Sequence, residues 1–284
     1  MSGISQSPHP PARARQLSWL RVLILGLLLF IVTVLVMYWT HNTNLYPTVI
    51  VIGNFLVPVV FVAFLYDHQQ ITSLTPEMIA KSFVMGGVLG VLGASILESL
   101  LLPKPTGPND PISLRSGMII ALIEEGCKIA AVMLLARKIR HDAPIDGLLL
   151  GAAVGMGFAA LESTGYAFNA LIYNQGFVGA SIVETVLRGL IAPFGHGTWT
   201  AVLGAVLFRE SKPHRFRITF PVVMAFIFVV VLHGCWDGLP HTIRVVIPPG
   251  LPISLASIVI SILGLGTLFL VYRGAEREPA VPET

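Results

Sequence analysis

Runs of about twenty apolar residues recur along this chain, and they constrain its fold more than any other feature. Hydrophobic residues make up 54% of the sequence and charged residues only 12%, so each run is apolar enough to cross a bilayer as a helix. The runs lack the alternation of a membrane barrel, and helices are the other way to satisfy a backbone in lipid. We therefore predict an all-α membrane protein with about eight transmembrane helices. The runs cover residues 20–39, 48–66, 82–102, 114–136, 146–172, 182–208, 218–239 and 251–272.

The distribution of basic residues predicts the orientation of these helices. Most of the 18 lysines and arginines fall on one side of the membrane if both termini are cytoplasmic. We therefore expect a multi-pass protein of the cell (plasma) membrane with both termini in the cytoplasm. The net charge of +3 follows from this bias, and because the basic residues are scattered over short loops they do not indicate a nucleic acid partner.

Ionisable side chains lie inside four consecutive apolar runs, where they are costly. Each acid or lysine at mid-membrane costs about 2.5–3.5 kcal/mol on insertion scales, so together they must face one another or a water-filled cavity. The residues are Glu124, Glu125 and Lys128 in the fourth run, Glu162 in the fifth, Glu184, Arg188 and His196 in the sixth, and His233 and Asp237 in the seventh.

Helical spacing brings several of these groups together in pairs. Residues four apart share a helix face, which pairs Glu124 with Lys128 and His233 with Asp237. The same spacing predicts a salt bridge between Arg188 and Glu184, although Arg188 could instead touch a substrate. Each pair alone could be a structural ion pair. Their joint occurrence on neighbouring spans favours a functional site, because intramembrane charges are costly to keep.

Small residues should let these helices approach closely. Gly147, Gly151 and Gly155 form a small-xxx-small stripe on the fifth run, and Gly86 and Gly90 do the same on the third. Pro193, Gly195 and Gly197 surround His196 and should loosen the helix there, which exposes backbone groups.

Four motifs in order resemble a known family. The segment EEGCK (Glu124–Lys128) matches EExxK, FAALE (Phe158–Glu162) matches FxxxE, His196 follows alone, and HGCWD (His233–Asp237) matches HxxxD. Across residues 117–240 the chain resembles the PrsW family of intramembrane proteases. It is more distantly similar to the CAAX prenyl endopeptidase and bacteriocin-processing group. One departure is Ser163, where PrsW-like chains have asparagine after the glutamate.

The resemblance implies an intramembrane endopeptidase of the glutamate type that cleaves a membrane-anchored protein within or near the lipid bilayer. The substrate class known for the family is an anti-sigma factor. A glutamate can act as general base on water, and histidines can hold that water or donate to the oxyanion. Lys128 and Arg188 are expected to balance charge. The expected catalytic residues are Glu124, Glu125, Glu162, His196, His233 and Asp237, of which Glu124 or Glu125 is the base.

The apolar runs, the polar ends of the sequence and the resemblance together predict a division of the chain into four parts. They are a disordered cytoplasmic tail (1–18), transmembrane helices one to three (19–111), a catalytic core of helices four to seven (112–240), and helix eight with a cytoplasmic tail (241–284).

Metal dependence and the function class each leave an alternative. We expect no cofactor, because the sequence has no HExxH helix. A zinc-dependent version of the same protease could use His196, His233 and Glu162 as ligands. Acids and histidines in membrane spans also relay protons, so a proton-coupled secondary transporter is the alternative from another class.

Overall fold

Helices make up almost all of the protein's described structure. The computed structural model describes residues 17–68, 72–103, 112–141, 143–239, 244–247 and 251–277, so nearly all of the predicted N-terminal tail lies outside the described residues. The long elements are α1 (Ser18–Thr40), α2 (Tyr46–Asp67), α3 (Pro76–Leu101), α4 (Leu114–Ala136), α5 (Pro144–Tyr173), α8 (Phe220–Gly238) and α9 (Leu255–Arg277). The shorter ones are η1 (Thr43–Leu45), α6 (Val178–Ile191), η2 (Ala192–Phe194), α7 (His196–Glu210), β1 (Arg244–Ile247) and β2 (Leu251–Ser254).

The predicted fold class is confirmed. Within the described residues, seven helical segments are long and apolar enough to cross a membrane, with α6 and α7 counted together as one. The remaining predicted span, the fourth run, is α4, which has 23 residues and carries Glu124, Glu125 and Lys128 near its middle. The chain is therefore an all-α, multi-pass membrane protein apart from one short pair of strands.

The sixth apolar run is interrupted where the sequence predicted a weakness. Helix α6 ends at Ile191, a single 3-10 turn carries Pro193, and α7 begins at His196. Proline cannot continue the helical hydrogen bonds, and Gly195 before His196 adopts a backbone conformation outside the helical region. The break places His196 at the first position of a helix in the interior of the run.

The predicted start of the last span is wrong by four residues. Residues 251–254 form β2, which pairs antiparallel with β1 in the register Arg244↔Ser254, and α9 begins only at Leu255. A short apolar run before a helix has the same hydrophobicity whether it is a strand or a helical turn. The prediction from hydropathy therefore included the residues of β2 in the helix.

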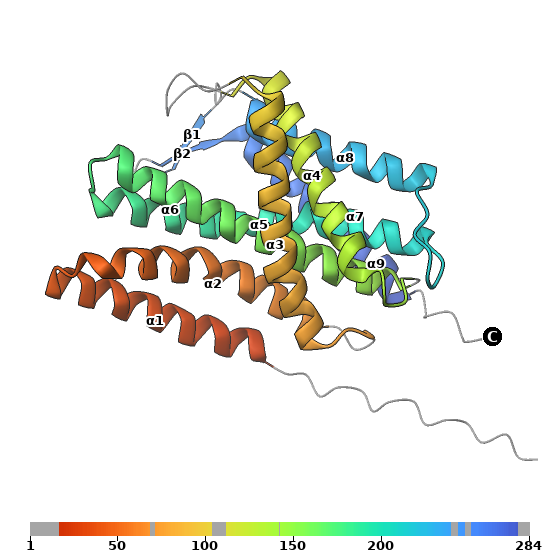
Figure 1. Cartoon of the computed structure of the whole chain (residues 1–284), viewed down its shortest axis with the longest axis horizontal. Coiled ribbons are helices and arrows are strands. Elements are labelled where there is room, and N and C mark those ends of the chain that lie inside the picture. Colours follow the sequence, from red (N-terminus) through yellow and green to blue (C-terminus); the bar gives the residue numbers. More distant parts are fainter. Residues whose placement is uncertain are drawn as a thin grey trace, which may run out of the picture.

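Helix α5 is the centre of the molecule and packs against α2, α3, α6 and α7. Its small residues allow backbone contact with α7, since a Cβ at Gly147 would lie 2.3 Å from Gly204 O and one at Gly151 would lie 2.2 Å from Thr200 O. On another side α3 crosses α5, as Figure 1 shows, where a Cβ at Gly86 would lie 2.4 Å from the side chain of Val154 and one at Gly90 would lie 2.9 Å from the ring of Phe158. The predicted small-residue stripes thus form two helix contacts that hold α5 in place.

A third close contact joins α4 to α8. A Cβ at Gly117 would lie 2.8 Å from Gly234 O, and one at Gly238 would lie 2.6 Å from the Cα of Leu114. The two backbones therefore touch near the start of α4 and the end of α8. This contact sets the glutamates of α4 beside His233 of α8.

Candidate active site

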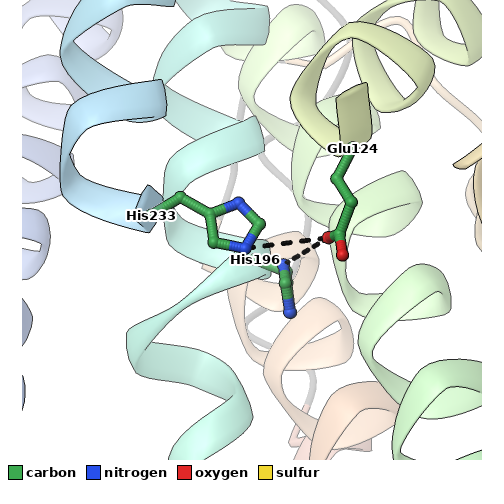
Figure 2. A group of neighbouring side chains, drawn as sticks. All are labelled: Glu124, His196 and His233. Carbon is green, nitrogen blue, oxygen red and sulfur yellow. Dashed lines mark ion pairs between the residues drawn. The ribbon is translucent and has the colours of Figure 1, made fainter. Parts of the chain in front are cut away.

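Three side chains from three helices converge in the interior (Figure 2). Glu124 of α4, His196 of α7 and His233 of α8 each offer one ligand atom within 4.8 Å of the others. Glu124 Oε2 lies 3.8 Å from His196 Nδ1 and 3.7 Å from His233 Nε2. Both distances are too long for a direct hydrogen bond and suit a group that bridges them, such as a water molecule.

Lys128 lies beside this group and is fully buried. Its ammonium donates to Glu124 Oε2 at 3.0 Å, to Glu125 Oε1 at 2.8 Å and to His196 Nδ1 at 2.7 Å. The ring of Phe158 covers it, with Nζ 4.0 Å from the ring centroid. The charge of Lys128 therefore stabilises both adjacent glutamates and fixes the orientation of His196.

Glu125 is held entirely by protein groups. Its Oε1 accepts from Lys128 and from His233 Nδ1, which is 3.0 Å away, and its Oε2 accepts from Thr200 Oγ1 at 3.3 Å. The side chain is fully buried. Because both oxygens have partners, Glu125 orients its neighbours, whereas Glu124 Oε2 is the carboxylate oxygen that faces both histidines.

Glu162 and Arg188 form an ion pair on the other side of His196. Arg188 Nη2 lies 2.9 Å from Glu162 Oε2, and His196 Nε2 lies 3.1 Å from the same oxygen. Arg188 also donates to Ser163 Oγ at 3.1 Å and stacks over Tyr166. In the described part of the chain Arg188 therefore pairs with Glu162, so the expected salt bridge with Glu184 is wrong. Helical spacing could not show that α6 packs on α5.

His233 is held by carboxylates at both ring nitrogens. Its Nε2 lies 3.2 Å from Asp237 Oδ2, which confirms the predicted pairing of the HxxxD residues, while its Nδ1 faces Glu125. Trp199 stacks on the ring at 4.7 Å between centroids, and His196 meets it edge-on at 4.9 Å. These contacts leave His233 with one orientation.

A small cavity opens beside His196. It has a volume of about 40 Å³, which is room for a few water molecules. His196 belongs both to the lining of this cavity and to the buried group around Glu124. A molecule in the cavity would therefore reach the site from the side of His196. The lining residues are Ala159, Ser163, Arg188, Ile191, Ala192, Gly195, His196, Trp199 and Trp236.

The structure brings every predicted site residue into one connected network. Lys128 links Glu124, Glu125 and His196, and the network then continues through Glu162 to Arg188 and through His233 to Asp237. The participants that were missed include Thr200 on Glu125 and Tyr166 under Arg188. Each lies four residues after a predicted site residue, His196 or Glu162, and this shared helix face is a signal that could have found them.

The donor set itself is one that zinc accepts. One carboxylate and two imidazoles make an open three-ligand site, but the grouped carboxylate is Glu124 and not the Glu162 of the sequence-based alternative. Two of these ligand atoms, His196 Nδ1 and Glu124 Oε2, already accept from the Lys128 ammonium. As the side chains lie, the residues therefore do not fit a metal ion unless Lys128 moves away.

A buried set of glutamates, histidines and one lysine between transmembrane helices fits a class of protein, the hydrolases that work inside a membrane. Residues 75–265 match the PrsW family of intramembrane metalloproteases, and the chain belongs to this family. The match extends beyond the four motif-bearing helices into α3 and α9. The protein is therefore an intramembrane protease that acts on membrane proteins. The family match thus favours the predicted protease over the alternative of a transporter. Neither a curated protein nor a solved structure matches the chain.

Proposed function

We propose that this protease hydrolyses a peptide bond of a membrane-anchored protein by general base catalysis, with Glu124 activating a water molecule. The observation that carries the proposal is the convergence of Glu124 Oε2 on His196 Nδ1 and His233 Nε2 at 3.8 and 3.7 Å. A water beside these atoms can donate to the Glu124 carboxylate and accept from the Nε2–H of His233. Residues 112–240, which carry all of these groups, are the catalytic core in this account.

The reaction follows from this placement. Glu124 takes a proton from the water while the water oxygen attacks the carbonyl carbon of the substrate. The carbon–nitrogen bond then breaks, and Glu124 returns the proton to the leaving amine. His196 lies between the cavity and the base, and it can stabilise the negative oxygen that develops by turning its Nε2–H from Glu162 to that oxygen. No step in this sequence needs a metal ion.

The remaining site residues position the reacting ones. Glu125 fixes His233 and shares Lys128 with Glu124. Glu162 accepts from His196 Nε2, which leaves Nδ1 to accept from Lys128. Asp237 supports His233 from its own helix. Fixed donors and acceptors of this kind lower the barrier because they need no reorganisation during the reaction.

The proposed substrate is a single-span protein of the plasma membrane, and an anti-sigma factor is the class we favour. The resemblance to the PrsW family through its four motifs supports this choice. The bias of basic residues supports an orientation with both termini in the cytoplasm. In that orientation Asp237, at the end of α8, lies toward the outer side, where a substrate with an extracytoplasmic domain would be cut.

Reconstitution with tagged single-span substrates tests the proposal. Wild-type protein should produce two fragments, and Glu124→Gln should produce none, since the amide cannot take a proton from water. Glu77→Gln is the matched control, because it removes an exposed glutamate from the first turn of α3. Equal cleavage by wild type and Glu124→Gln would falsify the assignment of Glu124 as the base.

A further inference from the structure

We propose that the Lys128 ammonium occupies the position a divalent cation would take in this site, so that the wild-type protein excludes metal. Removal of this one charge should then create a zinc site from Glu124, His196 and His233. The inference concerns the same side chains as the proposed function. It is tested by metal binding, which can be measured without proteolysis.

The first argument is the saturation of the lysine by its neighbours. An ammonium group has three N–H donors, and Lys128 has three acceptors at 2.7–3.0 Å, namely Glu124, Glu125 and His196. The face of Phe158 lies 4.0 Å from the same nitrogen. Lys128 is fully buried, so bulk water does not compete for these contacts. The position of its charge is therefore fixed by protein groups alone.

The second argument is that metal and lysine need the same electron pairs. The imidazole nitrogen His196 Nδ1 has a single lone pair, and this lone pair accepts from Lys128. A zinc ion bound to Nδ1 at about 2.0–2.1 Å would have to take that lone pair. The ion would also stand close to a positive charge that already neutralises Glu124 Oε2, 3.0 Å from Nζ. Both effects oppose metal binding while Lys128 is in place.

The third argument is that the site otherwise has the support that metal-binding histidines require. A histidine ligand usually donates its second ring nitrogen to a carboxylate, which fixes its orientation. His196 Nε2 lies 3.1 Å from Glu162, and His233 Nδ1 lies 3.0 Å from Glu125. Replacement of Lys128 by a neutral side chain would leave three ligands, of which the two histidines are already oriented, and an excess of negative charge.

The experiment compares zinc binding to full-length variants in lipid nanodiscs, purified through a tag without histidine and with substrate absent. Lys128→Met keeps the apolar stem and removes the ammonium. We expect it to bind one zinc ion at least about tenfold more tightly than wild type, because a charge of the same sign is removed from contact distance. Lys138→Met is the matched control, since it makes the same change at an exposed position beyond the end of α4 and should leave zinc affinity unchanged.

A double variant locates the ion. Lys128→Met with His233→Ala should lose the gained affinity, because one of the three proposed ligands is gone. Zinc affinity in Lys128→Met equal to or below that of wild type would overturn the inference. Retention of the gain in the double variant would overturn it as well, since the ion would then lie elsewhere.

Two further measurements cover a loss of stability in Lys128→Met. Zinc should raise the unfolding temperature of this variant and not that of wild type, because a ligand stabilises only the folded state that binds it. If Lys128→Met does not fold, Lys128→Gln is measured in its place, with the same expectation. Wild-type protein that has been exposed to zinc and then dialysed should retain no stoichiometric zinc, and a stoichiometric ion that survives dialysis would contradict the inference. None of these results depends on cleavage, whereas failure of the proposed function would appear in Glu124→Gln.

Discussion

Two carboxylate–cation pairs in this protein differ in their surroundings. The inner pair, Glu125 with Lys128, is fully buried and has every polar atom of the pair directed to another protein group. The rim pair, Glu162 with Arg188, is about one-fifth exposed, and Arg188 and His196 line the cavity beside it. The same kind of ion pair is thus buried and fixed in one place and partly exposed beside a cavity in the other.

This difference in burial predicts different effects of the two pairs on stability and on activity. Loss of one partner from a fully buried pair leaves an uncompensated charge, whereas loss from a partly exposed pair is moderated by water. The inner pair should therefore determine stability and activity together. The rim pair should affect activity more than stability.

The largest expected effect comes from Glu125→Gln. We expect a loss of about 3 kcal/mol in the free energy of unfolding, because Lys128 loses one of its two carboxylates in a buried site. Cleavage should also fall to background, since His233 loses the negatively charged partner at Nδ1. Unfolding curves and cleavage assays on the same preparations measure both. Glu162→Gln should lose at most about 1 kcal/mol. Equal destabilisation by the two variants would contradict the distinction between the pairs.

The next effect reaches the site through packing. A Cβ at Gly155 would lie 2.3 Å from the backbone oxygen of His196, so Gly155→Ala must displace the start of α7. We expect kcat/KM to fall by about 100-fold, as for a reacting group misplaced by about 1 Å. Gly165→Ala on the same helix meets no atom within 4 Å and should cleave at the wild-type rate. Unchanged cleavage by Gly155→Ala would show that this contact does not position His196.

A smaller effect tests the rim itself. Arg188→Met removes the partner of Glu162, so His196 Nε2 loses a fixed acceptor. We expect kcat to fall about tenfold while the unfolding free energy changes by less than about 1 kcal/mol. Arg188→Lys keeps the charge and should restore part of the rate. A rise in KM alone, with kcat unchanged, would instead indicate that Arg188 binds the substrate.

The smallest effect concerns a single hydrogen bond of the inner pair. Thr200→Val removes the donor 3.3 Å from Glu125 Oε2 and keeps the shape of the side chain. A loss of about 1 kcal/mol in stability follows from one neutral–charged hydrogen bond. Lys128 and His233 still hold Glu125, so cleavage should fall by less than about fivefold. A larger loss of cleavage would mean that Thr200 does more than support Glu125.

Much of the fold could be predicted because membrane spans depend on length and hydropathy. The eight runs matched helical segments, and Pro193 with Gly195 marked the break before His196. The β1–β2 pair was missed, because four-residue strands have no periodicity that separates them from a helix start. Short irregular elements depend on contacts that hydropathy does not contain.

The site was predictable to the extent that it is local. The pairs Glu124–Lys128 and His233–Asp237 follow from helical spacing and are present. The pair Glu162–Arg188 joins residues 26 apart, and it depends on how α6 packs against α5. The contact of Lys128 with His196 joins residues 68 apart and has no local signal at all. Contacts between helices require the packing that only the structure supplies.

A double-variant comparison of Glu124 and His196 tests the central claim most directly, since the account has both residues acting on one water molecule. Single-turnover cleavage would be measured for wild type, Glu124→Gln, His196→Ala and the double variant, above the uncatalysed background. Residues that act as one unit have strongly non-additive effects. The account predicts that the double variant cleaves about as slowly as the slower single variant. A rate loss equal to the product of the two single losses would contradict it.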